Sequence, residues 1–104
     1  MYKLVFFVPV DAKERVKAAV FGAGAGRIGR YECCSWEVAG TGQFRPLEGA
    51  NPAIGEVGAL ESVSEYRVEM VLEDARLTDV IAALRAAHPY EEPAFDVVKL
   101  AVIP

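Results

Sequence analysis

The pattern of apolar positions along the chain predicts most of its secondary structure. Residues 2–9 are apolar on both alternating faces, which is typical of a central strand covered on both sides. Residues 62–73 alternate between apolar and charged side chains and predict a strand with one buried face. A mostly apolar run over 95–103 predicts another strand. Together with the segment 28–38, the chain is expected to contain four strands.

The segment 28–38 has one face that is more apolar than the other. Cys34, Trp36 and Val38 share this face, which we expect to point into the core, whereas Cys33 lies on the opposite face. Because neighbouring residues of a strand point to opposite sides, a disulfide between the two adjacent cysteines would need strained geometry. Both cysteines are therefore expected to be reduced.

Two helices are expected between these strands. Asp11 is a suitable N-cap for the first, with Glu14 three residues later as in a capping box, and the apolar residues that follow share one helical face. Asp74 is the expected cap of the second helix. Pro89 disfavours the helical conformation at the residue before it, so this helix is expected to stop at His88.

The predicted order is β-α-β-β-α-β. This order indicates an α+β, ferredoxin-like fold in which a four-stranded antiparallel sheet carries two helices on one face. Because the strand 2–9 is apolar on both faces and the helices cover only one, we expect the other face to pack against further copies of the chain. The sequence thus predicts a homo-oligomer.

A long segment without hydrophobic periodicity separates the second and third predicted strands of the chain. Residues 39–61 contain five glycines and two prolines, and the segment is longer than the 12 to 15 residues of ordinary loops. It also carries apolar residues, among them Phe44, Leu47 and Ile54. We therefore expect this loop to pack against its own domain or a neighbouring subunit.

Composition and charge narrow the classes of function. The chain has 104 residues, 53% of them hydrophobic, which suits one folded domain over residues 1–104. Its net charge of −4 excludes the basic surface on which nucleic-acid binding depends. The longest apolar run, Leu4–Val10, is far shorter than the roughly 20 residues that span a bilayer. The N-terminus also lacks the pattern of a signal peptide, so a cytoplasmic protein is expected.

The residues Gly24–Gly29 match the pattern G-x-G-x-x-G of dinucleotide-binding loops. That fingerprint requires a strand before it and a helix after it, so that the helix N-terminus faces the pyrophosphate. Here a predicted helix comes before and a strand after. We therefore interpret the glycines as a helix C-terminus and a tight turn, where glycine tolerates positive φ.

The segment 88–93 is the strongest candidate for a functional site. It places His88, the only histidine of the chain, next to Tyr90, Glu91 and Glu92 between two prolines. Imidazole and carboxylates suit a divalent metal ion such as zinc, and a symmetric oligomer can supply further ligands from a neighbouring copy. The alternative is a helix end flanked by His88 and followed by solvated acidic residues.

Cys33 has two interpretations. It is either a small apolar side chain in a strand, or a soft metal ligand or redox-sensitive thiol that joins His88. A Cys–His hydrolase is a further possibility, although the sequence shows neither an oxyanion hole nor a group that orients the base.

Three ordered motifs resemble a known family. The segments GAGRIGRYECCSW at 24–36, GTGQFRPLEGANPAIG at 40–55 and HPYEEPAFDV at 88–97 look like the YqfO-type domain. This is the PII/CutA-like module of the NIF-three-like family of dinuclear-metal proteins, which is found inserted in many members and also as small stand-alone proteins. The resemblance extends over essentially the whole chain.

The resemblance implies a ferredoxin-like fold related to PII signalling proteins and to CutA, both of which form trimers, so a homotrimer is favoured. It also implies that the loop at 39–61 recognises partners and helps to bind small ligands between subunits. The dinuclear centre of the family lies on two flanking lobes that are absent here, and a single histidine cannot hold it. The catalytic activity of full-length relatives is therefore not expected to transfer.

The sequence and the resemblance together favour a non-enzymatic oligomeric module that binds a small metabolite or a divalent metal ion between subunits. We expect this module to act as a regulator or to dock onto a protein partner. Phe44 and Arg45 are the expected contact residues of the long loop, and Tyr90 and Arg27 are further ligand-binding candidates. Two alternatives stay open: a CutA-like protein of divalent-metal binding and tolerance, and a small hydrolase that depends on the cysteine and the histidine named above.

Overall fold

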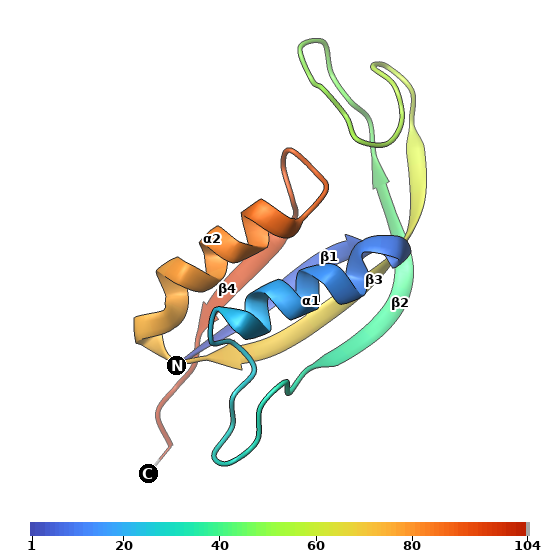
Figure 1. Ribbon diagram of the computed structural model, residues 1–104. Helices are drawn as coiled ribbons and strands as arrows, with labels where there is room; N and C mark the ends of the chain where they lie inside the picture. The colour runs from blue at the N-terminus through green and yellow to red at the C-terminus, as the bar shows by residue number, and fades with distance from the viewer. Residues whose placement is uncertain (104) are drawn as a thin grey trace.

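The computed structural model describes residues 1–103 and has the predicted order of strands and helices (Figure 1). The strands form one antiparallel sheet in the order β2-β3-β1-β4, and both helices lie on the same face of it. This confirms the α+β, ferredoxin-like fold. The elements are β1 Tyr2–Pro9, α1 Lys13–Gly22, β2 Trp36–Phe44, β3 Glu61–Leu72, α2 Leu77–Ala87 and β4 Phe95–Lys99.

The core lies between the sheet and the two helices. Alternate residues of the central strands point toward the helices, as the period of two requires, and most of them are fully buried. Removal of this apolar surface from water is the main source of stability. The largest buried side chains come from β1, β3 and both helices: Leu4, Phe6, Val8, Val68, Leu72, Val16, Val20, Val80 and Leu84.

The other side of the sheet carries no helix, and we call it the open face. Trp36 and Val38 lie on it with 61% and 44% of their surface exposed, so the prediction that they point into the core is wrong. The reason is that β2 is an edge strand whose other face, with Glu37, is turned toward α1. The open face includes Val5 and Phe7 of β1, Arg67 and Glu69 of β3, Trp36 and Val38 of β2, and Val98 of β4.

The second strand lies later in the sequence than the predicted segment 28–38. Residues 27–35 form a loop, in which Gly29 and Cys33 have φ values of 56° and 58° that an extended strand does not permit. The strand then continues through Gly40 and Gly42 to Phe44, so the loop expected at 39–61 is shortened to residues 45–60. Cys33 is therefore an exposed loop residue rather than a strand residue.

Strands β2 and β3 extend beyond the rest of the sheet. Strand β1 ends at Pro9, opposite Glu65, whereas the pairing of β2 with β3 continues from Gly40 and Glu65 to Phe44 and Glu61. The hairpin of residues 41–64, which we call the arm, projects from one end of the molecule (Figure 1). This accounts for the elongated shape, with extents of 50 × 24 × 23 Å.

Both helices begin after a short 3-10 turn, Val10–Ala12 or Asp74–Arg76, and neither has the predicted side-chain cap. At each helix the 3-10 turn lies where the capping side chain was expected. Asp74 accepts hydrogen bonds from the N-terminal amine and from Lys99 instead. The predicted stop before Pro89 is confirmed, because α2 ends at Ala87 and the next residue is extended.

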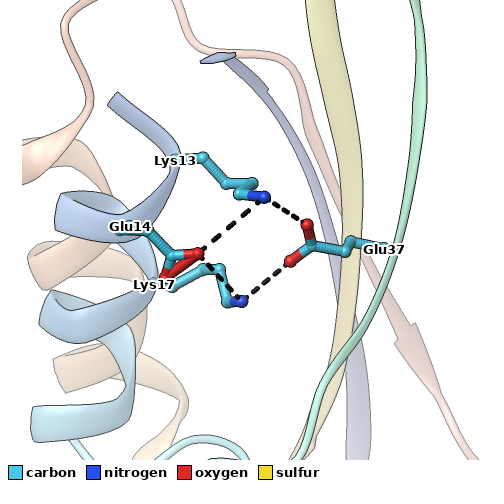
Figure 2. Close-up of polar contacts among 4 residues, drawn as sticks. All are labelled: Lys13, Glu14, Lys17 and Glu37. Carbon is cyan, nitrogen blue, oxygen red and sulfur yellow. Dashed lines mark hydrogen bonds and ion pairs between the residues drawn. The ribbon is translucent and has the colours of Figure 1, made fainter. Parts of the chain in front are cut away.

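Ion pairs join α1 to β2 near the base of the arm. Figure 2 shows Lys13 and Lys17 of the helix on the two carboxylate oxygens of Glu37, with the Lys17 contact at 2.8 Å. The hydrogen bonds from the two lysines hold the pKa of Glu37 below its usual value, and the bond from Lys13 has the larger effect. The ammonium of Lys13 also lies 3.9 Å from the centre of the Tyr66 ring.

The N-terminus lies beside the end of β4. The amide of Leu100 donates a hydrogen bond to the carbonyl of Met1 at 3.0 Å. Both ends are at the opposite end of the molecule from the arm (Figure 1). Neither α1 nor α2, the helices within residues 1–103, has the length and apolar character that crossing a membrane requires.

Candidate ligand-binding site

A cavity of about 540 Å³ lies on the open face at the base of the arm. Its walls come from β2 and β3, from the loop at 46–54 and from residues 90–94 after α2. Its volume is within the range of small-molecule sites, roughly 300 to 1,000 Å³. The lining is mostly apolar and includes Phe7, Val38, Phe44, Glu65, Arg67 and Tyr90.

Tyr90 connects the elements around this cavity. Its hydroxyl donates a hydrogen bond to Oε2 of Glu65 at 3.1 Å, and its ring lies 6.0 Å from the ring of Phe44 in a tilted arrangement. Burial, together with the negative charge of Glu65, raises the pKa of the Tyr90 hydroxyl well above its usual value. The side chain is therefore a neutral phenol at physiological pH.

His88 lies behind Tyr90 and positions it. The imidazole is 6% exposed; Nε2 lies 2.7 Å from the carbonyl oxygen of Phe7, and Nδ1 accepts a hydrogen bond from the amide of Tyr90 at 3.1 Å. These contacts require a proton on Nε2 and none on Nδ1. Burial lowers the pKa of His88, and a neutral ring satisfies both contacts.

A glycine makes room for the carboxylate of Glu65. A Cβ atom at Gly42 would overlap Oε1 of Glu65, whereas one at Gly40 would meet nothing within 4 Å. Both glycines belong to β2, and Gly40 pairs with Glu65 across the strands. The carboxylate of Glu65 can therefore lie against the backbone of β2 while it accepts the hydrogen bond from Tyr90.

The loop of the arm folds back onto the segment after α2. The amide of Asn51 donates to Oε1 of Glu91 at 2.9 Å, and the amide of Gly58 donates to the carbonyl of Pro46 at 2.8 Å. This loop closes one side of the cavity. The expectation that the loop packs against its own domain is met at this point.

The structure brings together some of the residues singled out in the sequence. Phe44, Tyr90, Glu91 and Glu92 all line the cavity, and His88 supports it from behind. Of the other candidates, the side chain of Arg45 is exposed next to the cavity without lining it, and Arg27 and Cys33 lie in the loop before β2.

Cys33 and His88 are near opposite ends of β1. The loop of Cys33 is held through Gly26, whose amide donates to the carbonyl of Val71, and Val71 pairs with Lys3. His88 instead contacts Phe7. Lys3 and Phe7 are four residues apart in β1, which corresponds to about 13 Å. Cys33 and His88 are therefore too far apart to contact each other within one chain.

The predicted metal ligands do not form a cluster in a single chain. Within residues 1–103, no three His, Cys, Asp or Glu side chains are arranged so that they hold a metal ion. Both ring nitrogens of His88 are engaged in the contacts described above. A metal site that combines Glu91 or Glu92 with residues of a neighbouring copy stays a prediction.

The sequence did not single out Glu65 as a site residue. Glu65 is one of several alternating charged residues of β3 and resembles a solvated position. The available signal was the pair of glycines Gly40 and Gly42, which share one face of a strand, where glycine indicates close approach of another group.

No family model matches the chain, but individual proteins do. It is 59% identical over 98 residues to a GTP cyclohydrolase 1 type 2 homolog of Mycobacterium tuberculosis. It is 48% identical over 101 residues to the protein of the same name from Halalkalibacterium halodurans. These alignments cover 94% and 97% of this chain but 26% and 27% of the relatives, so the chain spans about a quarter of their length.

Solved structures show the same relationship. A Bacillus cereus protein related to NIF3 superposes with a TM-score of 0.81 at 44% identity, over 95% of this chain and 25% of the other. The periplasmic divalent cation tolerance protein CutA from Archaeoglobus fulgidus has a TM-score of 0.69 at 14% identity, over 100% and 88%. At 14% identity, the likeness to CutA shows a shared fold alone.

Proposed function

Since this chain is a homologue of the domain inserted in the NIF3-related proteins and has the CutA/PII-like fold, we propose that it is an oligomeric, non-enzymatic module that binds a small ligand at the base of its arm. The observation that carries the proposal is the cavity of about 540 Å³ around Tyr90. A ligand there would contact the arm, through which the module regulates or docks onto a protein partner.

The cavity has the features of a binding site rather than of a packing defect. Its apolar walls end in a few fixed polar groups, since Glu65 is held by Tyr90 and Glu91 by the amide of Asn51. The backbone amide of Tyr90 donates to the buried His88, whose ring lies 4.9 Å from the ring of Tyr90. A preformed site of this kind loses little conformational entropy when a ligand binds.

The open face supports the oligomer. Trp36 and Val38 of the edge strand β2 expose 61% and 44% of their surface there, and Val98 of the opposite edge strand β4 exposes 51%, on a sheet face that no helix covers. Apolar patches of this kind are typical of interfaces between copies. Because the cavity opens on the same face, a neighbouring copy would complete its walls. We propose a trimer, as the resemblance to PII and CutA implies.

The proposal assigns no reaction to the chain. The relatives are named for a cyclohydrolase, but the chain spans only about a quarter of their length. Around the cavity, His88 uses both ring nitrogens in contacts with the backbone. A neutral imidazole without a free nitrogen is a positioning group, not a general base.

Native mass spectrometry of protein purified without chelator tests the proposal. We expect a trimer that retains a small molecule, and we expect Gly40→Phe, which places a ring in the open space beside Gly40, to lose that mass but keep the trimer. A monomer without any added mass would overturn the proposal. A retained metal that disappears in Glu91→Gln would instead favour the alternative of a metal site shared between copies, because carboxylates bind divalent ions.

A further inference from the structure

The charges that line the cavity are unbalanced. Glu65, Glu91 and Glu92 contribute three carboxylates, whereas Arg67 is the one cationic side chain among the lining residues. The guanidinium of Arg67 is itself paired, with Nε 3.3 Å from Glu69. The cavity therefore carries an excess of negative charge, which repels anionic ligands and attracts cations.

Aromatic rings stand beside these carboxylates. Phe7, Phe44 and Tyr90 line the cavity, and the ring faces of aromatic residues attract cations that are weakly hydrated. Tyr66 gives an example within the same chain, since the ammonium of Lys13 lies 3.9 Å from the centre of its ring. The walls thus combine apolar surface, ring faces and net negative charge.

The carboxylates are spread over the cavity walls, which suits a ligand with a delocalised positive charge better than a metal ion. A hard divalent ion needs several oxygen ligands that converge at about 2.0–2.6 Å. In residues 1–103 no three acidic, histidine or cysteine side chains converge in this way. Glu65 is directed to Tyr90 and Glu91 to the amide of Asn51, on different walls of the cavity.

We infer that the ligand of this cavity is an organic cation with an apolar body, such as a quaternary or alkylated ammonium group on a short chain or a ring. This inference rests on the proposed function of the cavity and adds the chemical class of its ligand. The apolar body lies against Phe44 and Val38, and the cationic group lies near Tyr90 and Glu65. The neutral phenol of Tyr90 adds no charge but holds the carboxylate in place.

Titrations of the isotope-labelled chain by NMR test the ligand class. The probes are choline, benzyltrimethylammonium, the neutral tert-butyl analogue of choline, benzoate and magnesium ion. We expect the two ammonium compounds to shift the amide signals of Gly40, Gly42 and Tyr90 and to bind about tenfold more tightly than the neutral analogue. Glu65→Gln should remove most of this preference, while the neutral analogue binds as before.

Matched variants exclude indirect effects. Glu48→Gln removes one carboxylate from the same loop but outside the lining of the cavity, so it should leave the affinity for choline unchanged. Phe44→Leu keeps an apolar side chain but removes a ring, and it should weaken the binding of both ammonium compounds severalfold.

The outcomes separate this inference from the proposed function. Equal binding of choline and its neutral analogue, or tighter binding of benzoate or magnesium ion, overturns the organic cation but leaves a ligand-binding cavity. If no probe shifts the cavity amides up to about 10 mM while native mass spectrometry finds another retained molecule, the cation class is wrong and the module still binds a ligand. If both experiments find nothing, both proposals fail.

Discussion

The hydroxyl of Tyr90 donates a hydrogen bond to Oε2 of Glu65 at 3.1 Å, across 25 residues of sequence. This contact ties the segment after α2 to the strand from which the arm projects. Both residues line the cavity, so a ligand at the proposed site would contact the two segments together. Its contribution to stability and its dependence on neighbouring groups are both measurable.

The first prediction concerns this hydrogen bond. Tyr90→Phe should lower the free energy of unfolding by about 1 kcal/mol, because it removes a hydrogen bond to a charged group that is only partly buried. Urea denaturation measures the change. Tyr31→Phe is the matched control: Tyr31 is 76% exposed in the loop before β2, so its variant should unfold as the wild type does.

A double-mutant cycle with Glu65→Gln isolates the pair. The coupling between the substitutions at Tyr90 and Glu65 should be roughly 0.5–1 kcal/mol, since each removes the same contact. Strictly additive effects would show that the hydroxyl and the carboxylate do not interact in solution.

The second prediction concerns two glycines of one strand. Gly42→Ala should displace the carboxylate of Glu65, which lies where the new Cβ atom would be, whereas Gly40→Ala should be tolerated because its Cβ meets open space. We expect the first variant to be less stable than the second by about 1 kcal/mol. Thermal unfolding of the two proteins side by side gives the comparison, and equal stabilities would contradict the packing of Glu65 on Gly42.

The third prediction concerns pH and His88. Burial lowers the pKa of this imidazole below its ordinary value of 6.5, even though the hydrogen bond to Phe7 and the charge of Glu65 act to raise it; the charge of Arg15 lowers it further. Below pH 6.5 the unfolded chain therefore binds more protons than the folded one. The free energy of unfolding should be steady just above this pH and should fall as the pH decreases through it, by up to about 1 kcal/mol per pH unit.

Two measurements separate this effect from other titrations. His88→Gln should remove the change between about pH 5 and 6.5, and NMR of the wild-type ring should show titration below its usual range. Glu37, whose pKa is lowered by Lys13 and Lys17, loses its contribution only as the pH falls below its ordinary value of 4.5. A wild-type ring that titrates at or above 6.5 would disprove the buried, neutral His88.

The fourth prediction concerns the open face. Trp36→Lys places a charge on the apolar edge strand of the proposed interface between copies and should shift the protein toward monomers, with at least a tenfold weaker association. Tyr31→Lys, outside the sheet, should not. Analytical ultracentrifugation reports the masses. Trp36 is the only tryptophan of the chain, so its emission should also move to longer wavelength on dilution; identical masses for both variants would place the interface elsewhere.

The central strands were predictable because their environment repeats along the sequence. In β3, Val68, Met70 and Leu72 point to the helices at every second position, and this period is visible without any structure. The edge strand β2 has no such pattern, because its middle consists of Gly40 and Gly42. Its true position depends on pairing with β3, which is a tertiary property.

The candidate site was predictable only where its residues are unusual in themselves. The segment from His88 to Glu92 was found because it concentrates rare side chains, and its role in metal binding stays a prediction. The sequence did not indicate that both nitrogens of His88 contact the backbone of Phe7 and Tyr90. Glu65 was not singled out for the site, because its contact with Tyr90 follows from the register of β3 and the end of α2. The register of β3 and the position of the end of α2 are set only in the folded chain.

The hydrogen bond from Leu100 to Met1 has a consequence for architecture. A longer polypeptide that continued from either end would leave and re-enter the module at a single point, so the module can be accommodated within a surface loop of a host protein without stretching it. The arm would then point away from the host.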